Sequence, residues 1–277
     1  FTFAGIDAPP VPSLLRGFSA PVTIHSDYDA QQLAFLAAHD SDPVNRWDAA
    51  QRTFVAAMLT LAADFSQGRR LQLPAALTEV VRALLADHTS DPALLAQALT
   101  PPDPAYVAAL ENVINVDGIA AAHRFLRTQL ARELRDAFTH RFNERRVRAP
   151  YAPSPDQTGA RKLANVCLEY LGTIDDAAAH ALAGAHFDAA DNMTDTIGAL
   201  AALRDSEATE REQIFARFED KWRDEPLVLD KWFREQALAW RVDTLDRLRD
   251  LLAHPRFNAR NPNRVRALVG AFTLRNF

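Results

Sequence analysis

Cysteine is nearly absent from this sequence of 277 residues, in which Cys167 stands alone. A single cysteine cannot form an internal disulfide, which is typical of a reducing compartment, so we expect a cytoplasmic protein. The apolar neighbours Val166 and Leu168 favour a buried thiol over a reactive one. The sequence also lacks a run of about 18 apolar residues and a basic segment followed by an apolar one at its start, so we expect neither a membrane span nor a signal peptide.

An excess of basic charge is missing too. The formal net charge is −5 and the pI is about 5.9, which gives no general attraction for nucleic acid or anionic lipid. We therefore expect neither nucleic acid nor a membrane among the partners. Glycine is scarce, and none of the nine glycines is spaced for a loop that cradles phosphate. The sequence has no nucleophile elbow, so nothing supports an independent hydrolase.

The eight histidines contain no metal-binding pattern. No two of them form the H-E-x-x-H pair that sets two ring nitrogens on one helix face. His180 and His186 would lie on nearly opposite faces of a helix, which favours ordinary surface or core histidines over a shared metal. We predict no catalytic residue, no metal site and no cofactor within this chain.

The first 27 residues differ from the rest of the sequence. Phe and Thr alternate at the start, several prolines follow, and Val22, Thr23 and Ile24 form a short β-branched run. These features predict strands and turns, although too few strands for a sheet that stands alone. We expect this segment to be a short β remnant ahead of a helical body.

Helix signals dominate from Asp29 onward. One long helix is expected to start at Asp42-Pro43 and to end at Gly68, a second opens at Pro74, and Asp117 heads a third. Farther along, helical pairs begin near Thr158, Asn192 and Leu227, a spacing of roughly 35 residues that is typical of stacked helical hairpins. We predict an all-α protein: a superhelical array of hairpins of the HEAT or ARM kind, a class that usually presents a concave surface.

Three short segments contain side chains for which the sequence allows either a structural or a functional role. In "ADNMTDTIGAL" (190–200), helix capping by Asn192 is favoured over a functional role, and in "DKWFREQALAW" (230–240) inter-helix packing is favoured over a stacking platform. In "RFNERRVRAP" (141–150) a solvated run of charges is favoured over an anion site.

A fourth segment, "NPNRVRALVGAF" (261–272), predicts a helix that starts with Asn261 as cap and Pro262 at its first position. Its apolar stripe is expected to hold four residues: Val265, Leu268, Val269 and Phe272. Arg264 and Arg266 flank this stripe, so we expect each to lay its stem on apolar surface and to present its head at the edge.

Five motifs occur along the chain in a fixed order: "LLRGFSAPV" (14–22), "RWDAAQ" (46–51), "NMTD" (192–195), "DKWF" (230–233) and "NPNRVRALVGAF" (261–272). In this order and at these separations they resemble the carboxy-terminal part of the bacterial aminopeptidase N family, the alanyl aminopeptidase branch of the zinc aminopeptidases. The resemblance covers essentially the whole chain. It implies that residues 1–27 are the tail of a small β-sandwich domain and that 28–277 are the carboxy-terminal helical-repeat domain, truncated before its last helices.

The same resemblance implies a function. The family's H-E-x-x-H and G-A-M-E-N motifs are absent here, so the chain would be a non-catalytic part of a zinc-dependent enzyme that removes amino-terminal residues from peptides. Its partners would be the catalytic and β-sandwich domains of the parent, together with peptide substrates. In the family this helical domain caps the active-site chamber and controls peptide access, and Arg266 matches an arginine that meets the carboxylate side of a peptide.

Two alternatives remain open. Arg266 can instead lie along its own helix or pair with an acidic residue of the chain. The protein itself can be a free-standing helical-repeat scaffold that binds another protein along its concave face.

Overall fold

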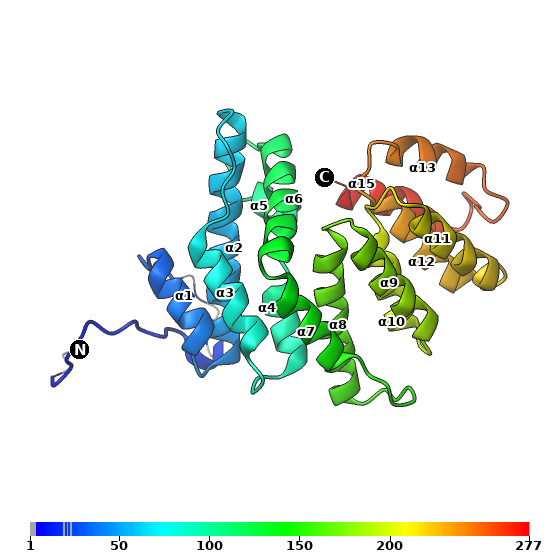
Figure 1. The fold of residues 1–277 in the computed structure, drawn as a ribbon. Coiled ribbons are helices and arrows are strands. Elements are labelled where there is room, and N and C mark those ends of the chain that lie inside the picture. The colour runs from blue at the N-terminus through cyan, green and yellow to red at the C-terminus, as the bar shows by residue number, and fades with distance from the viewer. Residues whose placement is uncertain (1–3, 19, 21, 23, 277) are drawn as a thin grey trace. The chain divides into compact units, whose positions relative to one another are not determined.

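The computed structural model describes residues 4–18, 20, 22 and 24–276, and these residues form helices and connecting segments without a β-strand (Figure 1). The all-α prediction is therefore confirmed. In chain order the elements are the short helix η1 (Arg16–Phe18), then α1 (Ala30–His39), α2 (Pro43–Ser66), α3 (Ala75–Ala86), α4 (Pro92–Leu99), α5 (Pro104–Ala108), α6 (Val116–Glu133), α7 (Arg135–Arg145), α8 (Pro155–Gly172), α9 (Ala177–Ala189), α10 (Met193–Leu203), α11 (Thr209–Trp222), α12 (Pro226–Ala237), α13 (Thr244–Leu252), α14 (Pro262–Val265), the π-helical segment η2 (Arg266–Gly270) and α15 (Ala271–Arg275). The chain divides into two compact units, residues 1–126 and 127–277.

Many of these helices begin at a capping residue followed by proline. Asp42 accepts hydrogen bonds from the backbone amides of Val44 and Asn45, and Pro43 occupies the first helical position, where no amide donor is needed. The same Asp-Pro, Ser-Pro or Asn-Pro arrangement starts α4, α5, α8 and α14. These starts are local in sequence, which explains why they can be predicted from it.

The first unit packs its helices around α2. Phe54, Met58 and Leu61 of α2 are fully buried, and α1, α3 and α4 contact this helix. Burying a side chain of this size stabilises the fold by roughly 1.5–3 kcal/mol. Phe65, one turn beyond Leu61, is 46% exposed, so the apolar stripe of α2 extends past the core.

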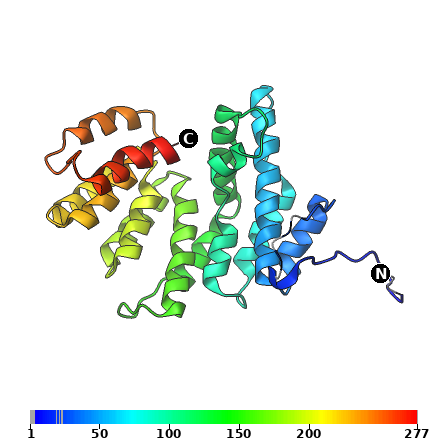
Figure 2. The same cartoon turned by 180° about the vertical axis from the view of Figure 1, so that it is seen from behind.

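The second unit is a stack of helical hairpins in two layers. α8, α10 and α12 contact one another in sequence, and α9 and α11 form a layer behind them (Figure 2). The hairpins start at Pro155, Met193 and Pro226, within three residues of the predicted starts. The stack thus has the periodicity that the sequence indicates.

A glycine lets two of these helices approach closely. A Cβ atom on Gly172, the last residue of α8, would lie 2.0 Å from the carbonyl oxygen of Ala202 in α10. Because the obstacle is backbone, no side-chain movement could relieve it. Gly172 is therefore required by the spacing of α8 and α10.

The segment before α1 corrects one prediction. Its described residues contain no strand; they form extended backbone and η1, and Leu15 and Gly17 have positive φ values of 53° and 73°. Instead, this segment contacts the connection between α1 and α2. Arg16 donates to Asp40 at 2.8 Å, and the backbone amide of Gly17 donates to Asp42 at 3.0 Å. A strand requires a hydrogen-bonding neighbour, and the described part of this chain supplies none. Thr23 of the predicted β-branched run lies outside the described residues, and the assignment of residues 1–27 to a sandwich domain stays a prediction.

Candidate functional site

Arg266, the residue predicted to contact substrate, begins a π-helical segment within the last helix. α14 continues through η2 into α15, so residues 262–275 form one helix with a π turn in its middle. The expected cap is present, since the Asn261 side chain accepts from the backbone amides of Asn263 and Arg264 at 3.0 and 3.4 Å. Single π turns inside helices are frequent at functional sites.

Arg264 does not lie at the edge of this helix, as the sequence suggested, but is buried. Its guanidinium donates to Asp230, to the carbonyl of Arg256 at 2.7 Å and to the carbonyl of Pro226 at 3.1 Å. The same group lies 4.8 Å from the centre of the Phe233 ring. Arg264 thus has a structural role, because it joins the last helix to α12 and to the loop that precedes the last helix.

Arg266 is exposed, and its side chain makes no hydrogen bond or ion pair with any residue that the structure describes. The sequence left open that Arg266 pairs with an acidic residue of the chain. No such pair is observed among the described residues. A guanidinium keeps its charge and offers paired donors that match a carboxylate. Arg266 is available for an anionic group from outside the described chain.

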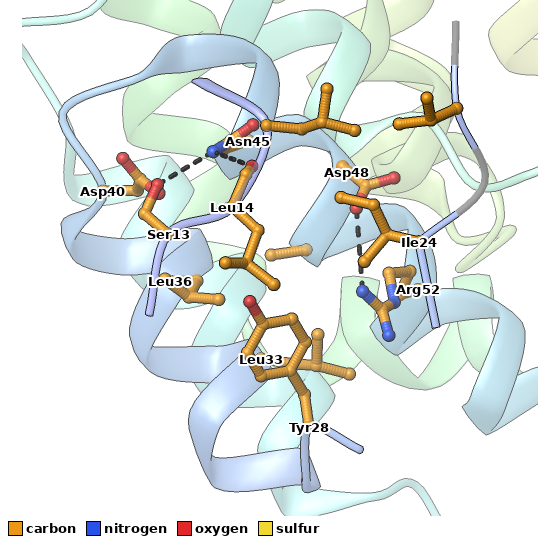
Figure 3. A pocket seen from close by; sticks show the side chains of 13 residues that line it. Ser13, Leu14, Ile24, Tyr28, Leu33, Leu36, Asp40, Asn45, Asp48 and Arg52 are labelled. Atoms are coloured by element: carbon orange, nitrogen blue, oxygen red, sulfur yellow. Dashed lines mark hydrogen bonds and ion pairs between the residues drawn. The ribbon is translucent and has the colours of Figure 1, made fainter. Parts of the chain in front are cut away.

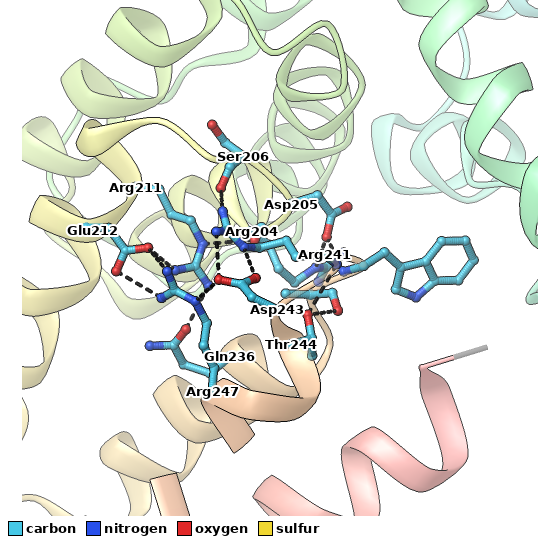
Figure 4. Close-up of polar contacts among 12 residues, drawn as sticks. Arg204, Asp205, Ser206, Arg211, Glu212, Gln236, Arg241, Asp243, Thr244 and Arg247 are labelled. Atoms are coloured by element: carbon cyan, nitrogen blue, oxygen red, sulfur yellow. Dashed lines mark hydrogen bonds and ion pairs between the residues drawn. The ribbon is translucent and has the colours of Figure 1, made fainter. Parts of the chain in front are cut away.

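The turn that follows α10 is held by Arg211 of α11 and by Arg241, which lies between α12 and α13 (Figure 4). Arg211, which has no exposed surface, donates to the carbonyl of Arg204 at 2.9 Å, and Arg241 donates to the carbonyl of Ser206. These donors satisfy carbonyls that the end of a helix leaves free. Burial lowers the pKa of Arg211 to about 10, so the side chain stays charged at neutral pH.

A second part of the same cluster joins α10 to α12. Arg204 donates to Glu235 at 3.0 Å and lies 3.8 Å from Asp205, which accepts from the backbone amide of Trp240 at 2.8 Å. Burial alone would lower the pKa of Arg204, but the carboxylates of Glu235 and Asp205 raise it. The Arg204–Glu235 pair therefore joins the end of α10 to α12.

The "NMTD" segment forms a buried polar network. Asn192 caps α10, as predicted, by accepting from the backbone amide of Asp195 at 3.0 Å. Asp195 itself is buried, and its carboxylate lies 3.5 Å from the Arg161 guanidinium. The Asn165 side chain donates to this carboxylate at 3.3 Å, and its amide oxygen lies 2.9 Å from the His186 ring nitrogen Nε2. Burial lowers the pKa of His186, so the imidazole is kept neutral.

The "DKWF" segment packs helices together, as expected. The Trp232 and Phe233 rings meet edge to face with centres 5.1 Å apart, and the Trp232 indole donates to the carbonyl of Phe215 at 2.9 Å. His254 lies against both rings, at 5.6 and 5.4 Å between ring centres. No stacking surface is left on these two buried rings for a ligand.

The run "RFNERRVRAP" is not simply a solvated charge run. Arg141 is 1% exposed and forms an ion pair with Glu144 at 2.9 Å, whereas Arg148 is exposed. Arg146 covers the Phe142 ring at 5.5 Å. The solvated interpretation is wrong for Arg141 because its helical position faces the core, a fact that charge alone does not reveal.

A pocket of about 320 Å³ lies in the first unit, between the segment before α1 and the helices α1 and α2 (Figure 3). Arg52 covers the Tyr28 ring at 5.1 Å and lies 3.9 Å from Asp48, whose pKa is raised by burial. Apolar side chains form most of the wall: Leu14, Leu15, Val22, Ile24, Leu33, Leu36 and Ala49. Several of its polar groups are used in holding the segment before α1: Asn45 donates to the Ser13 hydroxyl at 2.8 Å and to the carbonyl of Leu14 at 3.0 Å, and the Tyr28 hydroxyl donates to the carbonyl of Pro12 at 2.7 Å.

Among the described residues, no group of three or more His, Cys, Asp and Glu side chains could hold a metal ion. The described residues therefore offer no set of ligands that fits a zinc ion. The described helices also include none with the length and apolar content to span a bilayer.

Comparisons with known proteins agree with this architecture. A family model described as "Domain of unknown function (DUF3458_C) ARM repeats" matches residues 30–277. The aminopeptidases N of Escherichia coli (strain K12) and Haemophilus influenzae are 36% identical over 272 residues and 35% identical over 276, and these matches cover 98% and 100% of this chain but 31% of each relative. The solved aminopeptidase A of Legionella pneumophila, in complex with aspartic acid, matches with a TM-score of 0.81 at 30% identity over 98% of this chain and 32% of that one.

The chain therefore spans about a third of the length of these relatives. The predicted ARM-like repeat and the resemblance to aminopeptidase N are both confirmed. The chain belongs to the family of ARM-repeat domains that this model describes, and it corresponds to the carboxy-terminal helical domain of bacterial aminopeptidases N.

Proposed function

We propose that this chain is the non-catalytic helical domain of a cytoplasmic, zinc-dependent aminopeptidase N, which removes amino-terminal residues from peptides. The observation that carries the proposal is identity of 35–36% to aminopeptidases N over nearly the whole chain. In this proposal the domain covers the active-site chamber of the parent enzyme and controls which peptides enter. The free-standing scaffold has no comparable support.

Catalysis would belong to the rest of the parent polypeptide. The described residues contain no metal-binding cluster, so zinc, which polarises a peptide carbonyl and activates water in such enzymes, would be held elsewhere. The catalytic and β-sandwich domains of the parent are the partners of this domain in the proposal.

Arg266 is the residue of this chain that we assign to substrate. Its exposure and its lack of a partner among the described residues support this role, because a side chain that binds substrate must be free before substrate arrives. The ligand would be the carboxylate at the far end of a peptide, which a guanidinium can hold with two hydrogen bonds. Arg264, two positions earlier, is already committed to Asp230.

The experiment is to express the full reading frame that encodes this chain and to assay it beside residues 1–277. The full-length protein is expected to contain stoichiometric zinc and to release amino-terminal residues from peptides until a chelator is added. The 277-residue chain is expected to bind no zinc and to cleave nothing. A full-length protein without peptidase activity would favour the scaffold alternative.

A further inference from the structure

The first unit carries an exposed apolar patch beside the carboxyl end of α2. Between α5 and the first turn of α6, apolar side chains face solvent: Val113 is 83% exposed and Ile114 is 55% exposed. We call this surface the 106–116 patch; its members are Tyr106, Leu110, Val113, Ile114 and Val116, together with Phe65 at the end of α2.

The patch is preorganised. The Asn115 side chain donates to the carbonyl of Ala62 at 3.1 Å and to the Ser66 hydroxyl at 2.7 Å, and it accepts from the backbone amide of Gly118 at 3.0 Å. These bonds tie the connecting segment to the end of α2, beside Phe65. Gly118 permits the arrangement, since a Cβ atom there would lie 2.2 Å from the Asn115 amide.

The composition of the patch is that of the centre of an interface. Glu111 is the one charged residue between 106 and 116. Interface centres are depleted of charge and enriched in aromatic and aliphatic side chains, whereas isolated exposed apolar residues need no explanation. Here the exposed apolar residues are gathered on one ordered segment instead of being scattered.

We propose that the 106–116 patch is the surface on which the remaining polypeptide of the parent enzyme packs, through an apolar face of its own. This inference rests on the proposed function, because it requires a longer parent. About two thirds of the length of the matched relatives lies outside the region that this chain covers.

The small number of residues in the patch favours a contact within one polypeptide over a second copy of the chain. The patch has six residues, whereas a stable complex between separate proteins needs about 20–30 residues on each partner, because association costs translational and rotational freedom. A contact within one polypeptide does not bear that cost and can therefore form on fewer residues.

The test uses cysteine labelling of the full-length protein. Val113→Cys places a thiol of similar size at the most exposed point of the patch, and Val242→Cys, at a position that is 100% exposed in this chain, is the matched control. Labelling by a maleimide is followed by mass spectrometry of the peptide that carries each new cysteine, first in native protein and then in denaturant. Neither change removes a buried group, so both variants are expected to fold.

The expected result is that Val113→Cys labels at least about tenfold more slowly in native protein than in denaturant, at every protein concentration. Native labelling within about twofold of the denatured rate would overturn the proposal, since the patch would then be open to solvent. Protection that increases with protein concentration would overturn it as well, because it would place a second copy on the patch. Peptidase activity of the same samples is measured separately, so failure of the proposed function is distinguished from failure of this inference.

Discussion

Arg264 and Arg266 lie two positions apart on one helix, yet the first is buried against Asp230 and Phe233 and the second is exposed without a partner among the described residues. The difference follows from geometry, because two positions correspond to about 200° around a helix. One arginine therefore faces the core and the other faces away from it. Within this single motif, Arg264 has a structural role and Arg266 is available for a binding role.

The stability of the chain should respond to these two residues very differently. Arg264→Ala leaves the Asp230 carboxylate without its partner and is expected to destabilise the chain by about 3–5 kcal/mol. Arg266→Ala is expected to change the free energy of unfolding by less than about 0.5 kcal/mol. Urea unfolding of both variants measures this, and similar losses in the two would contradict the assignment.

Glycine substitutions test the spacing of the hairpins. Gly172→Ala drives a methyl group into the backbone of Ala202 and is expected to cost about 1–3 kcal/mol of stability. Gly184→Ala, inside α9, meets nothing closer than 3.8 Å and is expected to stabilise by about 0.5–1 kcal/mol. Opposite shifts of the two unfolding midpoints are predicted; a neutral Gly172→Ala would show that α8 and α10 can separate.

The thiol of Cys167 should not react with thiol reagents in the native protein. Burial raises its pKa to about 12, so the reactive thiolate is scarce at ordinary pH and reagents cannot reach it. Titration of the 277-residue chain with a chromogenic disulfide at pH 8 should detect no thiol before unfolding and one afterwards. Rapid labelling of folded protein would mean that the helix α8 opens easily.

Acid should weaken the first unit through Asp87. Burial alone would raise the pKa of Asp87, but hydrogen bonds from Ser90, Arg46 and Thr89 outweigh it and hold the pKa well below its usual range. A carboxylate with a depressed pKa contributes stability that is present above its unfolded pKa of about 4 and is lost as pH falls through the folded pKa.

Asp87→Asn should consequently lower the unfolding free energy at pH 6, and the gap to the unmodified chain should shrink as pH approaches 2. Ser90→Ala, which keeps the carboxylate but removes one hydrogen bond at 2.7 Å, is expected to show a smaller effect of the same sign. Unfolding measured between pH 2 and 6 checks both. A gap that does not change with pH would remove Asp87 from the acid response.

Sequence reasoning succeeded where the determinants are local. The start of α2 is set by Asp42 and Pro43, which are adjacent, and the hairpins of the second unit follow from a periodicity that needs no knowledge of contacts. The capping role of Asn192 is local in the same way. The expected strands failed because strands depend on a neighbour, which the described residues do not contain.

The buried arginines could not be predicted for a related reason. Arg264 and its partner Asp230 are 34 positions apart, and Arg211 and Gln236 are 25 apart. The sequence shows the charges but not which helices bring them together, so Arg264 was expected to present its head at the edge of its helix. Only the fold reveals that Arg264 is committed and that Arg266 is not.

The most direct test of the account is the effect of Arg266→Ala in the full-length enzyme on two kinds of substrate. Peptides with a free terminal carboxylate should lose about 10- to 150-fold in kcat/KM, the range that corresponds to one charged hydrogen bond of about 1.5–3 kcal/mol. Single-residue chromogenic substrates and peptides with an amidated terminus should change by less than about twofold, and Arg260→Ala, another exposed arginine ahead of the same helix, should affect no substrate. Equal losses on both kinds of substrate, or no loss on either, would contradict a role for this domain in holding the peptide.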